Sequence, residues 1–172
     1  AMATLNISSK SSDWRARRLS NFAVDSFFLD GELLASVEGF IQGIKFPEGS
    51  ARRQAAFQSA GKDAKRFGED AERKFVWWMG EEIEYASPGH YALNGRAIRA
   101  RLEQNPEAMR ALRETADLEL THDLGEPESP HTSLPASVFC NIPTRIGAKA
   151  LKRVTQKTKL LAYDLTDTSK SC

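Results

Sequence analysis

The sequence predicts a single domain of the α+β class that is mainly α-helical and carries small β-hairpins. The chain has 172 residues, a length that suits one well-packed domain rather than two. Apolar residues recur at helical spacing, most clearly at 36–46 and 88–104. Two short β-prone stretches, each folded around a Gly-containing turn, predict hairpins between the helices. We expect the domain at 14–160, between a flexible N-terminal arm at 1–13 and a flexible tail at 161–172.

Charge and hydropathy exclude several classes of protein. The 24 Lys and Arg residues nearly cancel the 23 Asp and Glu residues, and the net charge of +1 gives no global field that favours nucleic acid. No run of about 18 apolar residues exists, so we expect no membrane-spanning helix. The N-terminus lacks the apolar core of a signal peptide, and we therefore expect a cytoplasmic protein.

Cysteine and histidine are too few and too scattered to predict a disulfide framework or a metal site. Cys140 and Cys172 lie far apart in the chain, which is typical of a protein from a reducing compartment. His90, His122 and His131 form no ligand-spaced pair with one another or with Cys140. No Walker loop, G-x-G-x-x-G or G-x-S-x-G motif is present. The sequence therefore predicts neither a metal nor a cofactor.

Turn and capping residues place the individual elements. Asp30-Gly31 predicts the turn of a hairpin at 27–34, and Met79-Gly80 predicts the turn of a second hairpin at 75–85. Helices are expected, in chain order, at 36–46, 50–60, 62–67, 88–104, 106–115 and 144–155. Three of these helices follow a serine whose hydroxyl can accept a free first-turn amide proton: Ser36, Ser50 and Ser87.

The helix at 36–46 organises the chain, because distinct residue types divide its surface. One stripe at helical spacing is apolar and consists of Val37, Phe40, Ile41 and Ile44. A second line consists of Gly39 and Gly43, each of which costs about 1 kcal/mol of helix propensity relative to Ala. Such a cost indicates that a ligand or another backbone comes close to the helix at these positions.

Glu38, Gln42 and Lys45 share a further face of the same helix. Their i, i+4 and i+7 spacing places them within about 60° of one another around the helix axis. A solvated Glu–Lys face is the common form of this pattern, and a functional carboxylate beside an ammonium group is the alternative. In a site, Lys45 could hold Glu38 ionised, or it could act as an amine nucleophile if burial lowered its pKa.

Arginines and tryptophans offer partners for a phosphorylated, planar ligand. Arg17, Arg18 and Arg101 are candidate phosphate clamps, and pairing with acids inside the fold is the alternative. Trp77 and Trp78 are neighbours on a predicted strand and should point to opposite faces. One should enter the core, and the other can stack on a base, which is worth about 1–3 kcal/mol. Alternatively, both are core or edge residues.

Three stretches of the chain combine into one longer motif. They are L-S-N-F-A at Leu19–Ala23, D-G at Asp30-Gly31 and S-V-E-G-F-I-Q-G-I-K at Ser36–Lys45. Together they resemble the opening signature of the NADAR (YbiA-like) family, which reads approximately [LF]-S-N-F, D-G and S-x-E-H-x-[FY]-Q-A-x-K. Gly39 stands where the family usually has His, and Gly43 stands where it usually has Ala.

Later stretches extend the resemblance over about Arg17–Leu120. Ser87–His90 is similar to the S-x-x-H that begins a family helix. Ala97–Asn105 is similar to A-L-R-A-K-F-E-Q, with Arg101 where the family usually has Lys. The likeness then ends, because His122–Gly125 and a Pro/Ser-rich loop replace the family's Trp-Gly-x-Gly loop, and no Trp follows the second hairpin.

The resemblance implies a YbiA-like fold and an N-glycosidase that acts on an ADP-ribosyl or phosphoribosyl compound. The substrate would be ADP-ribosyl-guanine in nucleic acid or a phosphoribosylaminopyrimidine of riboflavin synthesis, with no membrane partner. The family is also associated with NAD metabolism and with phages. It implies Glu38 and Lys45 as catalytic residues. The implied substrate-binding residues are Arg17, Arg18, Ser20, Asn21, Phe22, Gln42, Trp77, Trp78 and Arg101. The alternative is a catalytically silent protein that binds ADP-ribose or a related nucleotide. The oligomeric state stays open.

Overall fold

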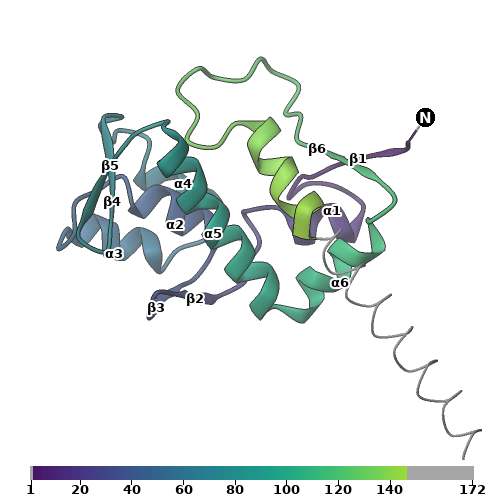
Figure 1. Cartoon of the computed structure of the whole chain (residues 1–172), viewed down its shortest axis with the longest axis horizontal. Helices are drawn as coiled ribbons and strands as arrows, with labels where there is room; N and C mark the ends of the chain where they lie inside the picture. Colours follow the sequence, from purple (N-terminus) through teal and green to yellow (C-terminus); the bar gives the residue numbers. More distant parts are fainter. Residues whose placement is uncertain (1, 147–172) are drawn as a thin grey trace, which may run out of the picture.

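Short helices and three small strand pairs make up the computed structural model, which describes residues 2–146 (Figure 1). The helices are α1 (Trp14–Leu19), α2 (Val37–Gly43), α3 (Ala51–Phe57), α4 (Gly61–Phe67), α5 (Pro88–Gln104) and α6 (Pro106–Glu114), followed by a helix whose described part spans 136–146. The strands are β1 (Thr4–Asn6), β2 (Phe27–Leu29), β3 (Glu32–Leu34), β4 (Phe75–Trp78), β5 (Glu81–Glu84) and β6 (Glu119–Thr121). The mainly helical α+β class predicted from the sequence is confirmed.

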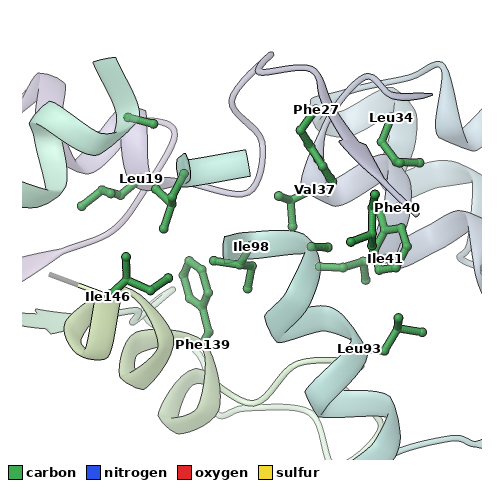
Figure 2. Close-up of a cluster of buried hydrophobic side chains, with 14 of the residues drawn as sticks. Leu19, Phe27, Leu34, Val37, Phe40, Ile41, Leu93, Ile98, Phe139 and Ile146 are labelled. Atoms are coloured by element: carbon green, nitrogen blue, oxygen red, sulfur yellow. The ribbon is translucent and has the colours of Figure 1, made fainter. Parts of the chain in front are cut away.

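Helix α5 holds the two parts of the molecule together. Figure 1 shows α5 running between α2, α3, α4 and the β4–β5 hairpin on one side and α1 and α6 on the other. Its Leu93 and Ile98 side chains are almost fully buried and belong to one continuous apolar core. Figure 2 shows Ile98 with Phe139 of the last helix on one side and Val37 of α2 on the other. Burial against α5 therefore fixes the position of α2.

The predicted serine caps are confirmed at three helix starts. The hydroxyl of Ser36 accepts the amide proton of Gly39 at 2.9 Å, which caps α2. Ser50 caps α3 and Ser87 caps α5 in the same way. Each cap satisfies an amide that the first helical turn leaves free. The sequence therefore fixes where α2 begins, and with it the first residue of the motif helix.

Both predicted hairpins are present. β2 pairs antiparallel with β3, and β4 pairs antiparallel with β5. Positive φ angles occur at the two turn residues of each hairpin: 48° at Asp30, 82° at Gly31, 48° at Met79 and 79° at Gly80. Two successive residues with positive φ match the right-handed twist of a two-residue hairpin, and glycine adopts that conformation without steric cost.

The two glycines of α2 mark a close crossing with α3. A Cβ atom on Gly39 would lie 2.4 Å from the Ala56 carbonyl oxygen and 2.6 Å from that of Ser59. A Cβ atom on Gly43 would lie 2.4 Å from the Phe57 ring. The expectation that something approaches the helix here is confirmed, and the neighbour is the backbone and core of α3. The imidazole that the NADAR signature places at the position of Gly39 has no room in this packing.

The N-terminal stretch differs from the expected flexible arm. β1 pairs in parallel with β6, and Leu5 lies opposite Leu120. Ile7 is fully buried and donates its amide to Thr121 at 2.7 Å. This pairing was not predictable from the sequence, because three-residue strands in a polar, Ser-rich stretch are too short to show alternation. Helix α1 was not predicted either, although Asp13 caps it.

The last helix begins earlier than predicted. The expected start at 144 follows Pro143, which usually breaks a helix. In the structure the helix is already present at 136, and Phe139 and Ile146, seven residues apart on one face, are both buried. Burial of these two side chains outweighs the amide hydrogen bond lost at Pro143. The predicted end of this helix, the domain boundary at 160 and the tail at 161–172 lie outside the described residues.

Candidate functional site

Three polar side chains of α2 and the turn after it form one hydrogen-bonded chain. The Lys45 Nζ donates to Gln42 Oε1 at 2.8 Å, and Gln42 Nε2 donates to Glu38 Oε1 at 2.8 Å. The Gln42 amide therefore links an ammonium group to a carboxylate. The predicted grouping of these residues on one helix face is confirmed, and the face is not a solvated one.

All three residues are buried in the fold. Glu38 is 8% exposed, Gln42 6% and Lys45 7%. Burial raises the pKa of Glu38, while the Gln42 hydrogen bond and the positive charges of Lys45, Lys65 and His122 oppose that rise. Burial also lowers the pKa of Lys45 to about 8, against the attraction of Glu38. Burial therefore stabilises the charged forms of Glu38 and Lys45 less than water would. Shifted pKa values of this kind are typical of functional sites.

Gly68, the C-cap of α4, leaves the space that Gln42 occupies. A Cβ atom at this position would lie 1.8 Å from Gln42 Oε1 and 2.8 Å from its Cδ. The backbone at Gly68 has φ −99° and ψ 2°, which other residues adopt readily. The glycine is therefore needed for space and not for its backbone freedom. It belongs to the A-K-R-F-G stretch at 64–68.

The hydrogen-bonded chain lines two adjoining cavities. The Glu38 cavity has a volume of about 550 Å³ and is lined by Glu38 and Gln42. The Lys45 cavity has a volume of about 520 Å³ and is lined by Gln42 and Lys45. Lys65 and His122 line both. Each volume lies in the range that binds a nucleotide-sized ligand.

The L-S-N-F motif forms part of the wall of the Glu38 cavity. Ser20, Asn21 and Phe22 all line this cavity. The Asn21 carbonyl accepts the amide proton of Glu38 at 3.1 Å, which ties the motif loop to the first turn of α2. The Asn21 Oδ1 is buried and accepts no hydrogen bond within the described residues. Six residues expected in the site therefore meet around the two cavities: Glu38, Lys45, Ser20, Asn21, Phe22 and Gln42.

Cations at the cavities come from segments that the sequence reasoning did not select. Lys10 and Lys62 line the Glu38 cavity, Arg73 lines the Lys45 cavity, and Lys65 lines both. Arg66, next to Lys65 on the same helix, is largely exposed and lies 3.8 Å from Asp63. A basic residue on a surface helix shows nothing about the cavity it faces until the fold is known.

The three arginines expected to bind substrate lie elsewhere. Arg101 and Asp25 are each 2% exposed, and the Arg101 Nη2 lies 2.8 Å from Asp25 Oδ2. Arg18 pairs with the same carboxylate, and Arg17 donates to the Ser11 carbonyl at 2.8 Å. None of the three arginines lines either cavity. The alternative prediction, that these arginines pair with acids inside the fold, holds for Arg18 and Arg101. Both pair with Asp25, which follows shortly after the L-S-N-F-A motif.

Both tryptophans also lie away from the two cavities. Trp78 is 4% exposed and packs edge-on against Phe40 at 5.1 Å, and its Nε1 donates to Asp30 at 2.7 Å. Trp77 is half-buried and donates to Glu82 at 3.1 Å across the hairpin. The expectation that they point to opposite faces is met, but one is a core residue and the other an edge residue. Phe22 is the aromatic residue of the motif that lines the Glu38 cavity.

Two other features bear on the kind of site. Within residues 2–146, no group of three His, Cys, Asp or Glu side chains is arranged to hold a metal ion. In the same part of the chain, no helix has the length and apolar character that crossing a membrane requires.

Comparison with known proteins places this geometry in a family. The chain is similar to the NMR structure of the E. coli protein YbiA, with a TM-score of 0.64 and 20% sequence identity over 88% of each chain. At that identity the likeness shows the fold, which is YbiA-like as expected. No curated protein matches the chain significantly. A family model described as bacteriophage protein GP30.3 matches residues 13–146. The chain therefore belongs to the bacteriophage protein GP30.3 family.

Proposed function

We propose that this protein is an N-glycosidase that hydrolyses the C–N glycosidic bond of an ADP-ribosyl or phosphoribosyl compound. The observation that carries the proposal is the buried Glu38–Gln42–Lys45 chain, whose Glu38 and Gln42 line a nucleotide-sized cavity and whose Lys45 lines the adjoining one. The resemblance of the surrounding motifs to the NADAR signature supports the same reaction class. ADP-ribosyl-guanine in nucleic acid and riboflavin-pathway phosphoribosylaminopyrimidines are the two substrate types to test.

Glu38 has the chemistry that this reaction needs. Breaking the bond between ribose C1 and the base nitrogen builds positive charge on C1 and the ring oxygen. A carboxylate held beside C1 stabilises this charge and can take a proton from the attacking water. The water oxygen then bonds to C1, and the electron pair of the broken bond goes to the base nitrogen. Lys45, through Gln42, favours the ionised form of Glu38 that this step requires.

The cavity walls suit the remaining parts of such a substrate. Lys10, Lys62 and Lys65 lie around the Glu38 cavity and can pair with phosphate oxygens. The buried Oδ1 of Asn21 can accept a hydrogen bond from a ribose hydroxyl. Phe22 offers an apolar ring beside the base. These lysines replace the arginines that the sequence suggested as phosphate clamps.

A second candidate function is supported by what the cavity lacks. The chain has no Trp-Gly-x-Gly loop, and Trp77 and Trp78 do not line either cavity. A cavity that binds ADP-ribose through its lysines but holds the base poorly would make a catalytically silent binding protein. The two functions differ in one observable, because only the enzyme breaks the C–N bond and separates the sugar from the base.

Base release measured by mass spectrometry tests the proposal. The protein is incubated with ADP-ribosyl-guanosine DNA and, separately, with phosphoribosylaminopyrimidines, and the products are identified by mass. Free guanine-containing DNA with free ADP-ribose, or free aminopyrimidine with ribose phosphate, is expected from one of the two substrates. Binding of ADP-ribose in a thermal-shift assay, with no release from either substrate, would replace the enzyme with the silent binder.

Gly68→Ala should slow this reaction. The added methyl group would displace the Gln42 amide and break its hydrogen bond with Lys45. We expect base release to fall about tenfold, a loss of about 1.4 kcal/mol in transition-state stabilisation. Gly95→Ala in α5 is the matched control, since its new Cβ would meet only Ile142 at 3.4 Å. A wild-type rate for Gly68→Ala would show that the position of the amide does not matter.

A further inference from the structure

His122 has one ring nitrogen committed to the fold. It follows β6 directly, and its Nδ1 lies 2.9 Å from the carbonyl oxygen of Ile7, next to β1. A carbonyl oxygen only accepts hydrogen bonds, so Nδ1 carries a proton and donates it. The other nitrogen, Nε2, is then the atom at which this ring gains or loses a proton. The β1–β6 pairing therefore sets the tautomer of His122.

A second contact sets the plane of the ring. Phe139 of the last helix packs against it at 5.3 Å between ring centroids with an angle of 82° between the planes. Phe139 is itself 3% exposed and belongs to the apolar core. Two elements far apart in the sequence therefore hold one imidazole in one orientation, as is usual for a proton-transferring residue whose partner atom must be met at hydrogen-bonding distance.

The same imidazole lines the cavity that contains Glu38. His122 lines both cavities, whereas His131 lines only the Lys45 cavity. The charge of His122 acts on Glu38 across this space and is among the influences that lower its pKa. A substrate held in the Glu38 cavity would therefore meet a carboxylate from α2 and an imidazole from the loop after β6.

We propose that His122 is the proton donor to the leaving base. This role rests on the proposed glycosidase function and supplies the group that function still lacks. As the bond between C1 and the base nitrogen breaks, that nitrogen keeps the electron pair and takes the proton from Nε2 of the imidazolium. Glu38 takes a proton from the attacking water, whose oxygen bonds to C1. The products are the neutral base, the free sugar, a neutral His122 and a protonated Glu38, so atoms and charge balance.

Leaving groups of different basicity separate this role from a structural one. His122→Asn keeps an N–H donor in reach of the Ile7 carbonyl and removes Nε2, so the variant should fold. It is compared with wild type on two substrates: the base-containing substrate found above and 4-nitrophenyl riboside 5-phosphate, whose leaving group departs without a proton. We expect base release to fall about 10²–10⁴-fold and nitrophenolate release to stay within about threefold of wild type.

Asn6→Ala is the matched control for disturbance of the same loop. The Asn6 amide holds the backbone of Asp123 at both its N–H and its carbonyl, and does not touch the imidazole. The Asn6→Ala variant should slow the reactions of both substrates by the same factor. Equal losses on both substrates for His122→Asn, or no loss on either, would overturn the role of His122. If wild type releases neither the base nor nitrophenolate, the proposed function fails and His122 has no reaction to serve.

Discussion

Replacing Arg101 with methionine is expected to lower the free energy of unfolding by about 3–5 kcal/mol, although Arg101 touches neither cavity. The Arg101 guanidinium donates to Asp25 Oδ2 from Nε at 3.0 Å and from Nη2 at 2.8 Å, and to the Leu19 carbonyl at 3.3 Å. Burial lowers the pKa of Arg101, and Asp25 opposes this by favouring the charged form. Removing the cation leaves a 2% exposed carboxylate with Arg18 as its remaining partner.

Urea denaturation of matched variants measures this effect. Arg101→Lys keeps the charge but not the two-pronged geometry, so it should lose less stability than Arg101→Met. Arg17→Ala is the control, because Arg17 is exposed and should change stability by no more than about 0.5 kcal/mol. Adding Asp25→Leu to Arg101→Met should recover part of the loss, since the buried carboxylate that lost its Arg101 partner is then removed. A loss below about 1 kcal/mol for Arg101→Met would show that the pair does not support the fold.

Replacing Lys45 with methionine is expected to lower base release about 10²-fold at neutral pH. The ammonium group favours ionised Glu38 through Gln42, and burial already raises the pKa of Glu38. Without Lys45 the pKa of Glu38 rises further, so the acidic limb of the pH–rate profile should move to higher pH. Lys65 and His122 also act on Glu38 and stay in place in this variant. An unchanged acidic limb would contradict this electrostatic role.

The alkaline side of the profile separates the two roles that Lys45 could have. Its pKa of about 8 leaves it about nine-tenths protonated at pH 7. An electrostatic role predicts that activity falls as pH rises through about 8, because the ammonium group is lost there. It also predicts that Lys45→Arg retains activity, because a guanidinium stays charged. An amine nucleophile predicts the reverse: activity that rises through pH 8, none in Lys45→Arg, and a borohydride-trapped adduct on Lys45.

The motif helix is the part of the site that the sequence could predict. Ser36, Glu38, Gln42 and Lys45 lie within ten residues of one another, so helical geometry alone brings them together. The neighbouring L-S-N-F loop could also be assigned to the site from local sequence. It lies close to α2 in the chain, and the Asn21 carbonyl accepts the amide proton of Glu38 in the first turn of α2. Local capping and turn chemistry likewise gave both hairpins and most helix starts.

The remaining site residues depend on contacts between distant segments. His122 reaches the cavity because β6 pairs with β1, and that pairing joins residues more than a hundred positions apart. Lys10 reaches it through the stretch that seemed to be a flexible arm. Arg101 was expected to bind substrate because its partner, the buried Asp25, lies 76 residues away in the sequence and could not be assigned before folding. The sequence around a charged residue does not show which cavity that residue will line in the fold.

In the proposed reaction Glu38 acts on bound substrate and does not merely contribute to binding. Glu38→Gln tests this most directly, because the amide oxygen can still accept from Gln42 while the negative charge is lost. Single-turnover base release and the Kd for ADP-ribose are measured for wild type and variant under the same conditions. We expect the rate of Glu38→Gln to be at least about 10²-fold lower and its Kd to stay within about threefold of wild type. Equal rates in the two proteins, or a rate loss explained wholly by weaker binding, would contradict it.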